Sequence, residues 1–307
     1  EHEVELGELS KIKVDGVGLY RTEHLYFNRA GLPSEEEQFN HYRLVAESAR
    51  PGVAVIRTLD PGGDQPPPAI ADFLPEETNP ALGMRGIRLA LRHQEILQTQ
   101  LQAILRAAAH GDVWIMFPMV SNLDEVKAAR EVLDRARTEL RKKGHAFGGV
   151  KEGVLVETPA AALSADLLAR ELDFLSIGTN DLTQFTLAVD RTNKDLAGLF
   201  DPFHPAMIRM FMELVRAAQS AGVPISVCGE LAGDPDAALA FIGMGYRSFS
   251  MTISKMPMLE QAVREITIEE SEAFAAKLLK CETGGEIRSL FNETPLRPSR
   301  TPFGFAV

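Results

Sequence analysis

Short apolar runs alternate with longer amphipathic stretches along most of the chain, and this alternation predicts both strands and helices. The predicted strands are Gly16–Tyr20, Val53–Arg57, Val113–Met119, Gly153–Val156, Phe174–Ile177, Pro224–Cys228 and Ser248–Ser250. The predicted helices are Ser34–Ala49, Gln94–Ala109, Leu123–Lys143, Ala160–Leu172, Pro205–Ala221 and Pro235–Met244. Strands and helices that alternate at this spacing are typical of parallel βα units. The pattern therefore favours an α/β fold, a (β/α)8 TIM barrel.

The two ends of the chain depart from this pattern. Glu1–Asp15 is charged and helix-like, so we expect the first barrel strand to lie upstream and to be absent from this chain. Asn292–Val307 is rich in proline and has no period, which predicts a tail. We accordingly assign residues 1–291 to the barrel domain and residues 292–307 to a C-terminal tail. Gln65–Asn79 holds four prolines and is predicted to be a loop.

Composition narrows the class of protein. The 307 residues are 45% hydrophobic, which is enough apolar material for a large core. A formal net charge of −11 argues against general nucleic-acid binding, which needs a basic face. The two cysteines form no disulfide framework or metal motif, and no apolar run is long enough to cross a membrane. These features favour a cytoplasmic protein that neither inserts into a membrane nor binds nucleic acid.

Polar residues of several kinds occur where the predicted strands end. They are Arg21, Arg57, Glu157, Asn180, Asp181 and Cys228. In a barrel the carboxyl ends of the strands converge on one mouth, where the active sites of barrel enzymes lie. This placement predicts a functional site at that mouth.

Arginines dominate the first half of this set. Arg21 and Arg57 each follow an apolar run, and Arg85 and Arg191 lie in neighbouring loops. The planar guanidinium suits phosphate and carboxylate groups, so the set predicts an anion site. A structural salt bridge to a nearby acid is the alternative for each single arginine.

Glu157 and Asp181 place two carboxylates at the same predicted mouth. Two carboxylates together with substrate phosphate oxygens are a common way to hold Mg²⁺, which we therefore predict as a cofactor. A pairing of either acid with an arginine is the structural alternative, and a general acid and base pair is less favoured.

Cys228 follows a predicted strand within Val227–Glu230. A single cysteine is most often a small apolar filler. Beside arginines and a metal it can instead act as an acid or a nucleophile. Cys281 has no such surroundings and is assigned no role.

Seven segments together resemble one known family, enzyme I of the bacterial sugar phosphotransferase system, a phosphoenolpyruvate–protein phosphotransferase. They are Gly16–Glu23, Ile56–Asp64, Asn79–Arg85, Val156–Ala161, Ser176–Gln184, Ala188–Arg191 and Cys228–Asp234. They occur in the family's order and cover nearly the whole chain to about Leu290. The resemblance is to the family's C-terminal domain, a barrel that binds phosphoenolpyruvate.

The resemblance implies a role for each candidate residue. Arg21, Arg57, Arg85, Asn180 and Arg191 would bind phosphoenolpyruvate, and Glu157 and Asp181 would ligate Mg²⁺. Cys228 would protonate enolpyruvate, with Arg21 and Arg57 also counted as catalytic. The phosphoryl group would pass to a histidine on an N-terminal domain absent from this chain, and from there to a phosphocarrier protein. The resemblance also implies a homodimer.

Three departures and three alternatives accompany the resemblance. Gln65 stands where the family usually has lysine, and the sequence of Ser250–Pro257 differs from the family's usual sequence there. The tail after Asn292 resembles no family sequence. The related phosphoenolpyruvate domains of pyruvate phosphate dikinase and phosphoenolpyruvate synthase are alternative assignments. A nitrogen-regulatory enzyme I variant, or a non-catalytic module that responds to phosphoenolpyruvate, is also compatible with the sequence.

Overall fold

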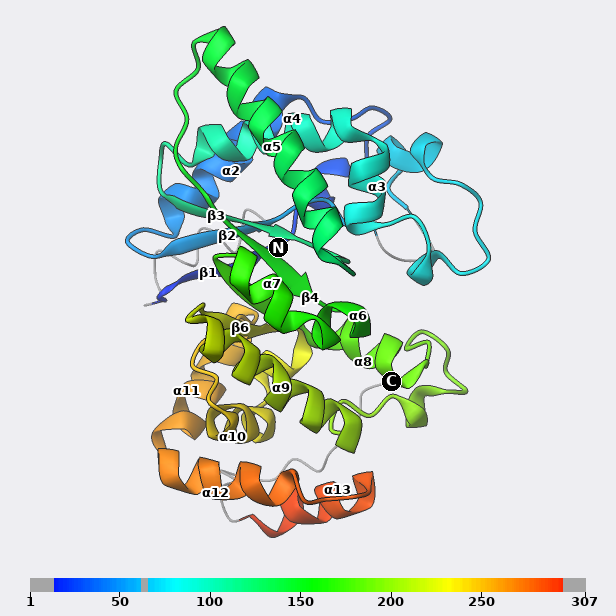
Figure 1. Cartoon of the computed structure of the whole chain (residues 1–307), viewed down its shortest axis with the longest axis vertical. Helices are drawn as coiled ribbons and strands as arrows, with labels where there is room; N and C mark the ends of the chain where they lie inside the picture. The colour runs from blue at the N-terminus through cyan, green and yellow to red at the C-terminus, as the bar shows by residue number, and fades with distance from the viewer. Residues whose placement is uncertain (1–13, 62–65, 295–307) are drawn as a thin grey trace. The chain divides into compact units, whose positions relative to one another are not determined.

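Four parallel strands in chain order form the sheet of the first compact unit, which comprises residues 1–155 and 172–174 (Figure 1). The computed structural model describes residues 14–61 and 66–294. The strands are β1 (Gly16–Tyr20), β2 (Val53–Arg57), β3 (Asp112–Phe117) and β4 (Lys151–Val156). Each pairs in parallel with the next, as in the register Arg57 to Met116 between β2 and β3. This is the order that successive βα units of a barrel produce.

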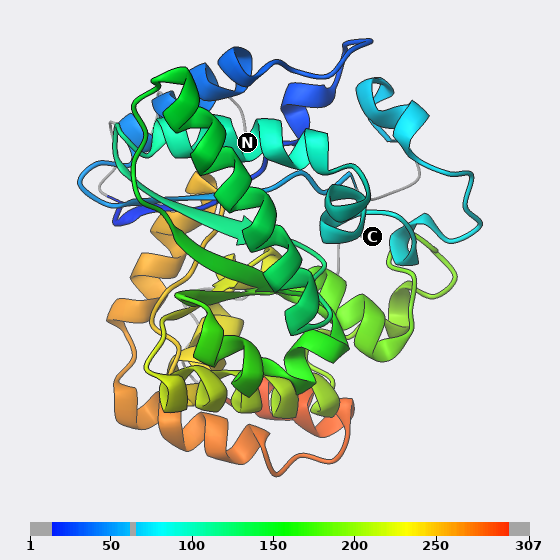
Figure 2. The same cartoon turned by 45° about the horizontal axis from the view of Figure 1, so that its top comes forward.

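Amphipathic helices cover this sheet. α2 (Glu35–Ser48) packs against α4 (Gln94–Ala107), and α4 packs against α5 (Leu123–Lys143), as Figure 2 also shows. The short helix α3 (Gly86–Arg92) contacts α4 and α5. A capping box starts α2, since the Ser34 hydroxyl accepts from the amide of Glu37 and the Glu37 carboxylate accepts from the amide of Ser34. Short 3₁₀ segments complete the unit at Glu23–Tyr26, Pro68–Phe73 and Pro80–Leu82.

The second compact unit comprises residues 156–171 and 175–307. Its strands β5 (Phe174–Gly178) and β6 (Ile225–Cys228) pair in parallel. Its longer helices are α6 (Pro159–Leu163), α7 (Ala165–Glu171), α8 (Thr179–Leu187), α9 (Pro205–Ala221), α10 (Pro235–Met244), α11 (Met256–Arg264), α12 (Ile268–Leu278) and α13 (Gly284–Glu293). Short 3₁₀ turns occur at Ala197–Leu199, Glu230–Gly233 and Ile253–Lys255.

The α/β class and the parallel, in-order strands expected of an α/β barrel are confirmed, and three helices have the predicted bounds. The prediction of a seventh strand at Ser248–Ser250 was wrong, because Phe249 makes only one isolated parallel bridge to Val227. The single predicted helix over Ala160–Leu172 is two helices, α6 and α7, which meet at Ser164. The predicted helix at the start of the chain falls mostly outside the described residues, as do Gln65 and the tail from residue 295 onwards.

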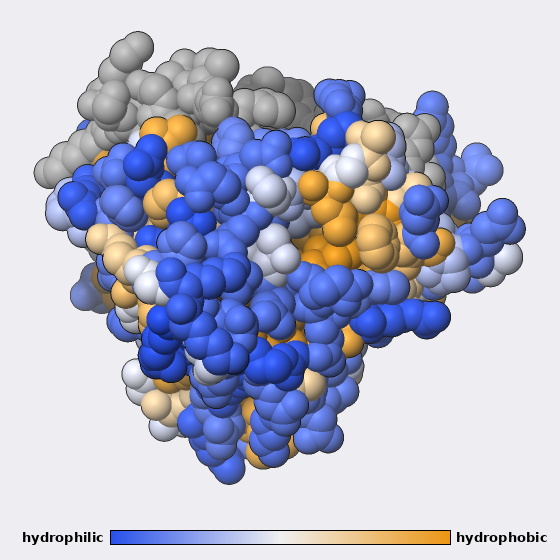
Figure 3. Space-filling model, turned by 90° about the horizontal axis from the view of Figure 1, so that it is seen from above, coloured by the Kyte–Doolittle hydropathy of each residue, from blue (hydrophilic) through white to orange (hydrophobic). Residues whose placement is uncertain are grey.

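Among the described residues, none of the helices has both the length and the apolar character that a membrane crossing requires. The face drawn in Figure 3 is mainly hydrophilic, with a smaller hydrophobic area among the polar residues. A mixed surface of this kind is usual, because apolar atoms contribute much of any folded protein's exterior.

Candidate functional site

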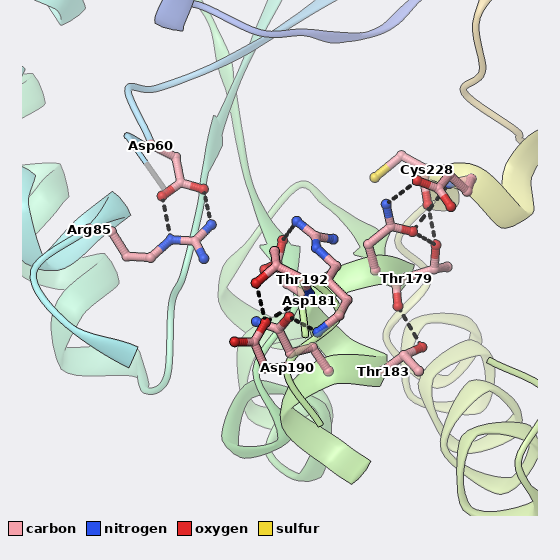
Figure 4. A network of polar contacts seen from close by, with 12 residues as sticks. Asp60, Arg85, Thr179, Asp181, Thr183, Asp190, Thr192 and Cys228 are labelled. Carbon is pink, nitrogen blue, oxygen red and sulfur yellow. Dashed lines mark hydrogen bonds and ion pairs between the residues drawn. The ribbon is translucent and has the colours of Figure 1, made fainter. Parts of the chain in front are cut away.

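Two arginines meet one buried carboxylate in the first unit. Arg85 donates two hydrogen bonds to Asp60, from Nε to Oδ1 at 3.0 Å and from Nη2 to Oδ2 at 2.7 Å (Figure 4). Arg57 approaches the same carboxylate, with Nη1 3.4 Å from Oδ2. All three residues are buried, with 3% of Asp60 exposed. Arg57 and Arg85, two of the arginines that the sequence assigned to an anion site, thus lie on one carboxylate within this unit.

Asp60 stays ionised in this environment. Burial opposes its ionisation, but the guanidinium groups of Arg85 and Arg57 outweigh burial and hold the pKa of this carboxyl below its ordinary value. Arg21 contributes to the same effect through its charge. A negative charge fixed between cations orients their planar groups at the carboxyl end of β2.

Glu23 adds a second acid to this cluster. Its Oε1 accepts from the backbone amide of Asp60 at 2.9 Å and lies 3.1 Å from Nη2 of Arg57. Arg21 is exposed and follows β1 directly. The structure thus contains the salt bridges that the sequence left open as the alternative for single arginines, and it places two of the arginines on a shared acid.

Arg85 is positioned by the tight entry to helix α3. Gly86 has a φ of 51°, and a Cβ at this position would lie 2.7 Å from Cβ of Met119. The amide of Ile87 donates to the carbonyl of Pro118 at 3.1 Å. Only glycine combines this backbone angle with so close an approach, and so residue 86 fixes where Arg85 leaves the chain.

The second unit places its candidate residues at strand ends, as predicted. Glu157 directly follows β4 and is 1% exposed. Asn180 and Asp181 follow β5 in the first turn of α8, a helix that the sequence pattern did not predict. Asp181 lies near Arg191, with Oδ2 3.8 Å from Nη2, which is an ion pair at longer than hydrogen-bonding distance.

Cys228 ends strand β6 and is 1% exposed. Its thiol donates to the carbonyl oxygen of Ile177 at 3.0 Å. Its own carbonyl accepts from Oγ1 of Thr179 at 3.0 Å (Figure 4). Gly229 follows with a φ of 89°, and a Cβ there would lie 2.6 Å from that Thr179 oxygen. The turn after Cys228 is therefore packed closely against the start of α8.

Glu230 connects this turn to Asn180. Its Oε1 accepts from Nδ2 of Asn180 at 3.3 Å, and its amide lies 3.4 Å from Oδ1 of the same side chain. Asn180 and Cys228, two residues predicted to act at the site, thus belong to neighbouring turns of the second unit.

The oxygen ligands available in this unit fit a hard divalent cation. Glu157 and Asp181 offer carboxylate oxygens, the donor type that Mg²⁺ prefers. Within residues 14–61 and 66–294 there is no group of three or more His, Cys, Asp or Glu side chains arranged to hold a metal. A metal at Glu157 and Asp181 would accordingly take its remaining ligands from water or substrate.

Sequence reasoning missed the two acids of the first unit. Asp60 and Glu23 lie within the motifs that contain Arg57 and Arg21 but were assigned no role. The available signal was their spacing, because Asp60 follows Arg57 by three residues and Glu23 follows Arg21 by two. An acid so close to a strand-end arginine is a natural partner for the arginines gathered at that end of the sheet, and Glu23 pairs with Arg57.

Comparison with known proteins agrees with the family resemblance of the seven sequence segments. Residues 1–268 match the family model described as PEP-utilising enzyme, PEP-binding domain. A phosphoenolpyruvate-protein phosphotransferase of Haemophilus influenzae is 43% identical over 286 residues, which are 93% of this chain and 49% of that protein. The protein of the same name from Bacillus subtilis is 42% identical over 281 residues, covering 91% of this chain and 49% of its own length.

The chain therefore spans about half the length of the curated relatives it matches. The resemblance to proteins named phosphoenolpyruvate-protein phosphotransferase is confirmed at about 40% identity. The family match extends over most of the chain, including every predicted site residue. The chain belongs to the family of PEP-utilising enzymes, in the region of their PEP-binding domain.

Proposed function

We propose that this chain binds phosphoenolpyruvate and provides the phosphoenolpyruvate site of a phosphoenolpyruvate–protein phosphotransferase. The observation that carries the proposal is the pair of buried arginines held on Asp60, in a chain that matches the PEP-binding family throughout this region. Phosphoenolpyruvate is a small trianion, and arginine forks are the side chains best suited to its phosphate and carboxylate.

In the first unit, Arg21, Arg57 and Arg85 bind the anionic substrate. Phosphoryl transfer is accelerated mainly by positioning and by neutralising charge on the transferring group, which ordered guanidinium groups provide. Asp60 holds the arginine planes before substrate arrives, and so the arginines need little reorganisation when it binds. Arg21 and Arg57 also contribute to catalysis as cations beside the transferred group.

In the second unit, Glu157 and Asp181 hold Mg²⁺, and Asn180 and Arg191 bind the substrate phosphate. The metal supplies further charge neutralisation on the phosphate oxygens. The first turn of α8 supports this assignment, because Asn180 and Asp181 lie at a helix start, where backbone amides favour anions.

Cys228 donates the proton that converts enolpyruvate to pyruvate. Its thiol lies 3.0 Å from the carbonyl oxygen of Ile177, to which the S–H group donates. Transfer to carbon requires the thiol to leave that carbonyl; the S–H bond breaks, a C–H bond forms on enolpyruvate, and the cysteine is left as a thiolate. Pyruvate leaves as the product.

The phosphoryl acceptor is a histidine of another domain, which then passes the group to a phosphocarrier protein. We propose that the protein works in the cytoplasm as a homodimer, and sedimentation equilibrium of the purified chain checks the dimer. The carrier and dimer assignments rest on the resemblance to enzyme I alone.

Transfer of labelled phosphate tests the function. The chain is mixed with ³²P-phosphoenolpyruvate, Mg²⁺ and a separate polypeptide carrying the acceptor-histidine domain of enzyme I. We expect the label on that polypeptide, pyruvate in equal amount, and none on this chain. Cys228→Ala should slow pyruvate formation, whereas Cys281→Ala serves as the matched cysteine control. Label retained by this chain alone would refute the proposed division of labour.

A further inference from the structure

A buried glutamine lies beneath the arginine cluster of the first unit. Gln100 is on helix α4, is 1% exposed, and makes three side-chain hydrogen bonds. Its Oε1 accepts from the backbone amide of Leu59 at 2.9 Å. Its Nε2 donates to Oγ1 of Thr22 at 3.1 Å and to the hydroxyl of Tyr42 at 3.1 Å. All the hydrogen-bonding capacity of the amide nitrogen is therefore used.

These partners are the segments that carry the substrate arginines. Thr22 follows Arg21, and Leu59 lies between Arg57 and Asp60. The Thr22 hydroxyl in turn donates to the carbonyl oxygen of Arg57 at 3.1 Å. One side chain thus connects the turn after β1 to the turn after β2.

Tyr42 links Gln100 to helix α2. The Tyr42 hydroxyl accepts from Gln100 and donates to Oε1 of Gln38 at 3.0 Å, and Nε2 of Gln38 donates to the carbonyl of Pro33 at 3.1 Å. Gln38 and Tyr42 are fully enclosed, with 1% and 0% exposed. Each side-chain amide and hydroxyl group in this network makes at least two hydrogen bonds, which makes the network rigid and costly to break.

The geometry points to Gln100 as a positioning residue that fixes the turns bearing Arg21, Arg57 and Asp60 for phosphoenolpyruvate binding. Gln100 acts through Leu59 and Thr22 and touches no substrate. This inference rests on the proposed function for the role of the arginines, while the hydrogen bonds themselves do not depend on it.

Gln100→Met tests the role, because methionine has a similar length and no amide. We expect the Kd for phosphoenolpyruvate to rise roughly tenfold as the two turns lose their shared anchor. In the complete transferase, the KM for phosphoenolpyruvate should rise more than kcat falls. Tyr42→Phe keeps the bonds to Leu59 and Thr22, and should therefore have a smaller effect on affinity.

Tyr246→Phe is the matched control for lost stability. The Tyr246 hydroxyl is buried in the second unit and donates to the carbonyl of Phe211 at 2.6 Å. This variant should lose stability without weakening phosphoenolpyruvate binding. A double-mutant cycle should show that Thr22→Val and Gln100→Met are coupled in their effect on Kd, whereas Tyr246→Phe and Gln100→Met are additive.

Amide hydrogen exchange in the ligand-free chain separates this inference from the proposed function. The Leu59 amide should exchange faster in Gln100→Met than in the wild type, while amides of the second unit keep their rates. A wild-type chain that binds no phosphoenolpyruvate would refute the proposed function, yet the exchange result would still decide whether Gln100 fixes the turn. The role of Gln100 would be overturned if the Leu59 amide exchanged at the same rate in Gln100→Met as in the wild type. It would also be overturned if the wild type bound phosphoenolpyruvate and Gln100→Met bound it with the same Kd.

Discussion

At the scale of single residues, the feature that organises the candidate site is a buried acid. Asp60 accepts two hydrogen bonds from Arg85 and lies beside Arg57. A buried arginine needs a partner, because an unpaired charge in the interior is strongly destabilising. Asp60 supplies that partner and at the same time sets the direction of the guanidinium planes.

Asp60→Asn should be strongly destabilising. The variant removes the carboxylate that two buried guanidinium groups share, which costs about 3–5 kcal/mol in the free energy of unfolding. Chemical denaturation measures this cost. Asp134→Asn removes an exposed carboxylate paired with Arg137 and should change stability by less than about 1 kcal/mol. Equal effects of the two variants would contradict the structural role of Asp60.

The depressed pKa of Asp60 predicts a pH dependence of stability. The folded pKa lies below the ordinary value of 3.8, so the ionised form favours the folded state. The stabilisation is fully present above that ordinary value and is lost as pH falls through the folded pKa. Between about pH 5 and pH 2, the free energy of unfolding should therefore fall more steeply for the wild type than for Asp60→Asn, because only the wild type loses the stabilisation from this carboxylate. Parallel curves for the two proteins would count against this assignment.

At the scale of secondary structure, elements with strong local signals were predicted well. α5 has the predicted bounds, because Asn122 and Glu125 form a capping box at its start and Gly144 ends it with a φ of 70°. α8 was missed, because Gly178 provides no side-chain cap and the first residues are typical of loops. Helix α8 also begins directly after the last residue of β5, so no connecting loop marks its start.

The candidate site shows the same division. The placement of Arg57 and Cys228 at strand ends follows from the hydrophobic pattern, and the structure confirms it. The bond from Gln100 to Leu59 joins residues 41 positions apart and has no local signal. Contacts at such a separation depend on how helix α4 packs on the sheet, which the pattern of a single sequence does not specify.

Gly86→Ala tests how an element positions a site residue. The added methyl group would meet Cβ of Met119 at 2.7 Å on a backbone with a φ of 51°, so the start of α3 must shift and carry Arg85 with it. We expect lower stability, by roughly 1–3 kcal/mol, and weaker phosphoenolpyruvate binding. Calorimetry and denaturation measure the two effects.

Asn122→Ala is the control for this variant. It removes the cap of α5 and should cost about 1 kcal/mol without moving Arg85. Gly86→Ala with full affinity for phosphoenolpyruvate would show that the α3 entry does not position the arginine.

At the scale of the whole molecule, an acidic chain is proposed to bind an anion. The formal net charge is −11, so the overall field does not attract phosphoenolpyruvate. The proposed binding must therefore depend on local groups, such as the arginines held on Asp60. This is why the proposed site needs ordered arginines and Mg²⁺ rather than a generally basic surface.

Calorimetric titration of the folded chain with phosphoenolpyruvate, in the presence and absence of Mg²⁺, tests this account most directly. We predict saturable binding at one site per chain that requires Mg²⁺ and is lost in Glu157→Gln, while the exposed-acid control Asp166→Asn binds as the wild type does. Absence of binding by a chain shown to be folded, or binding that is indifferent to both Mg²⁺ and Glu157, would contradict the account.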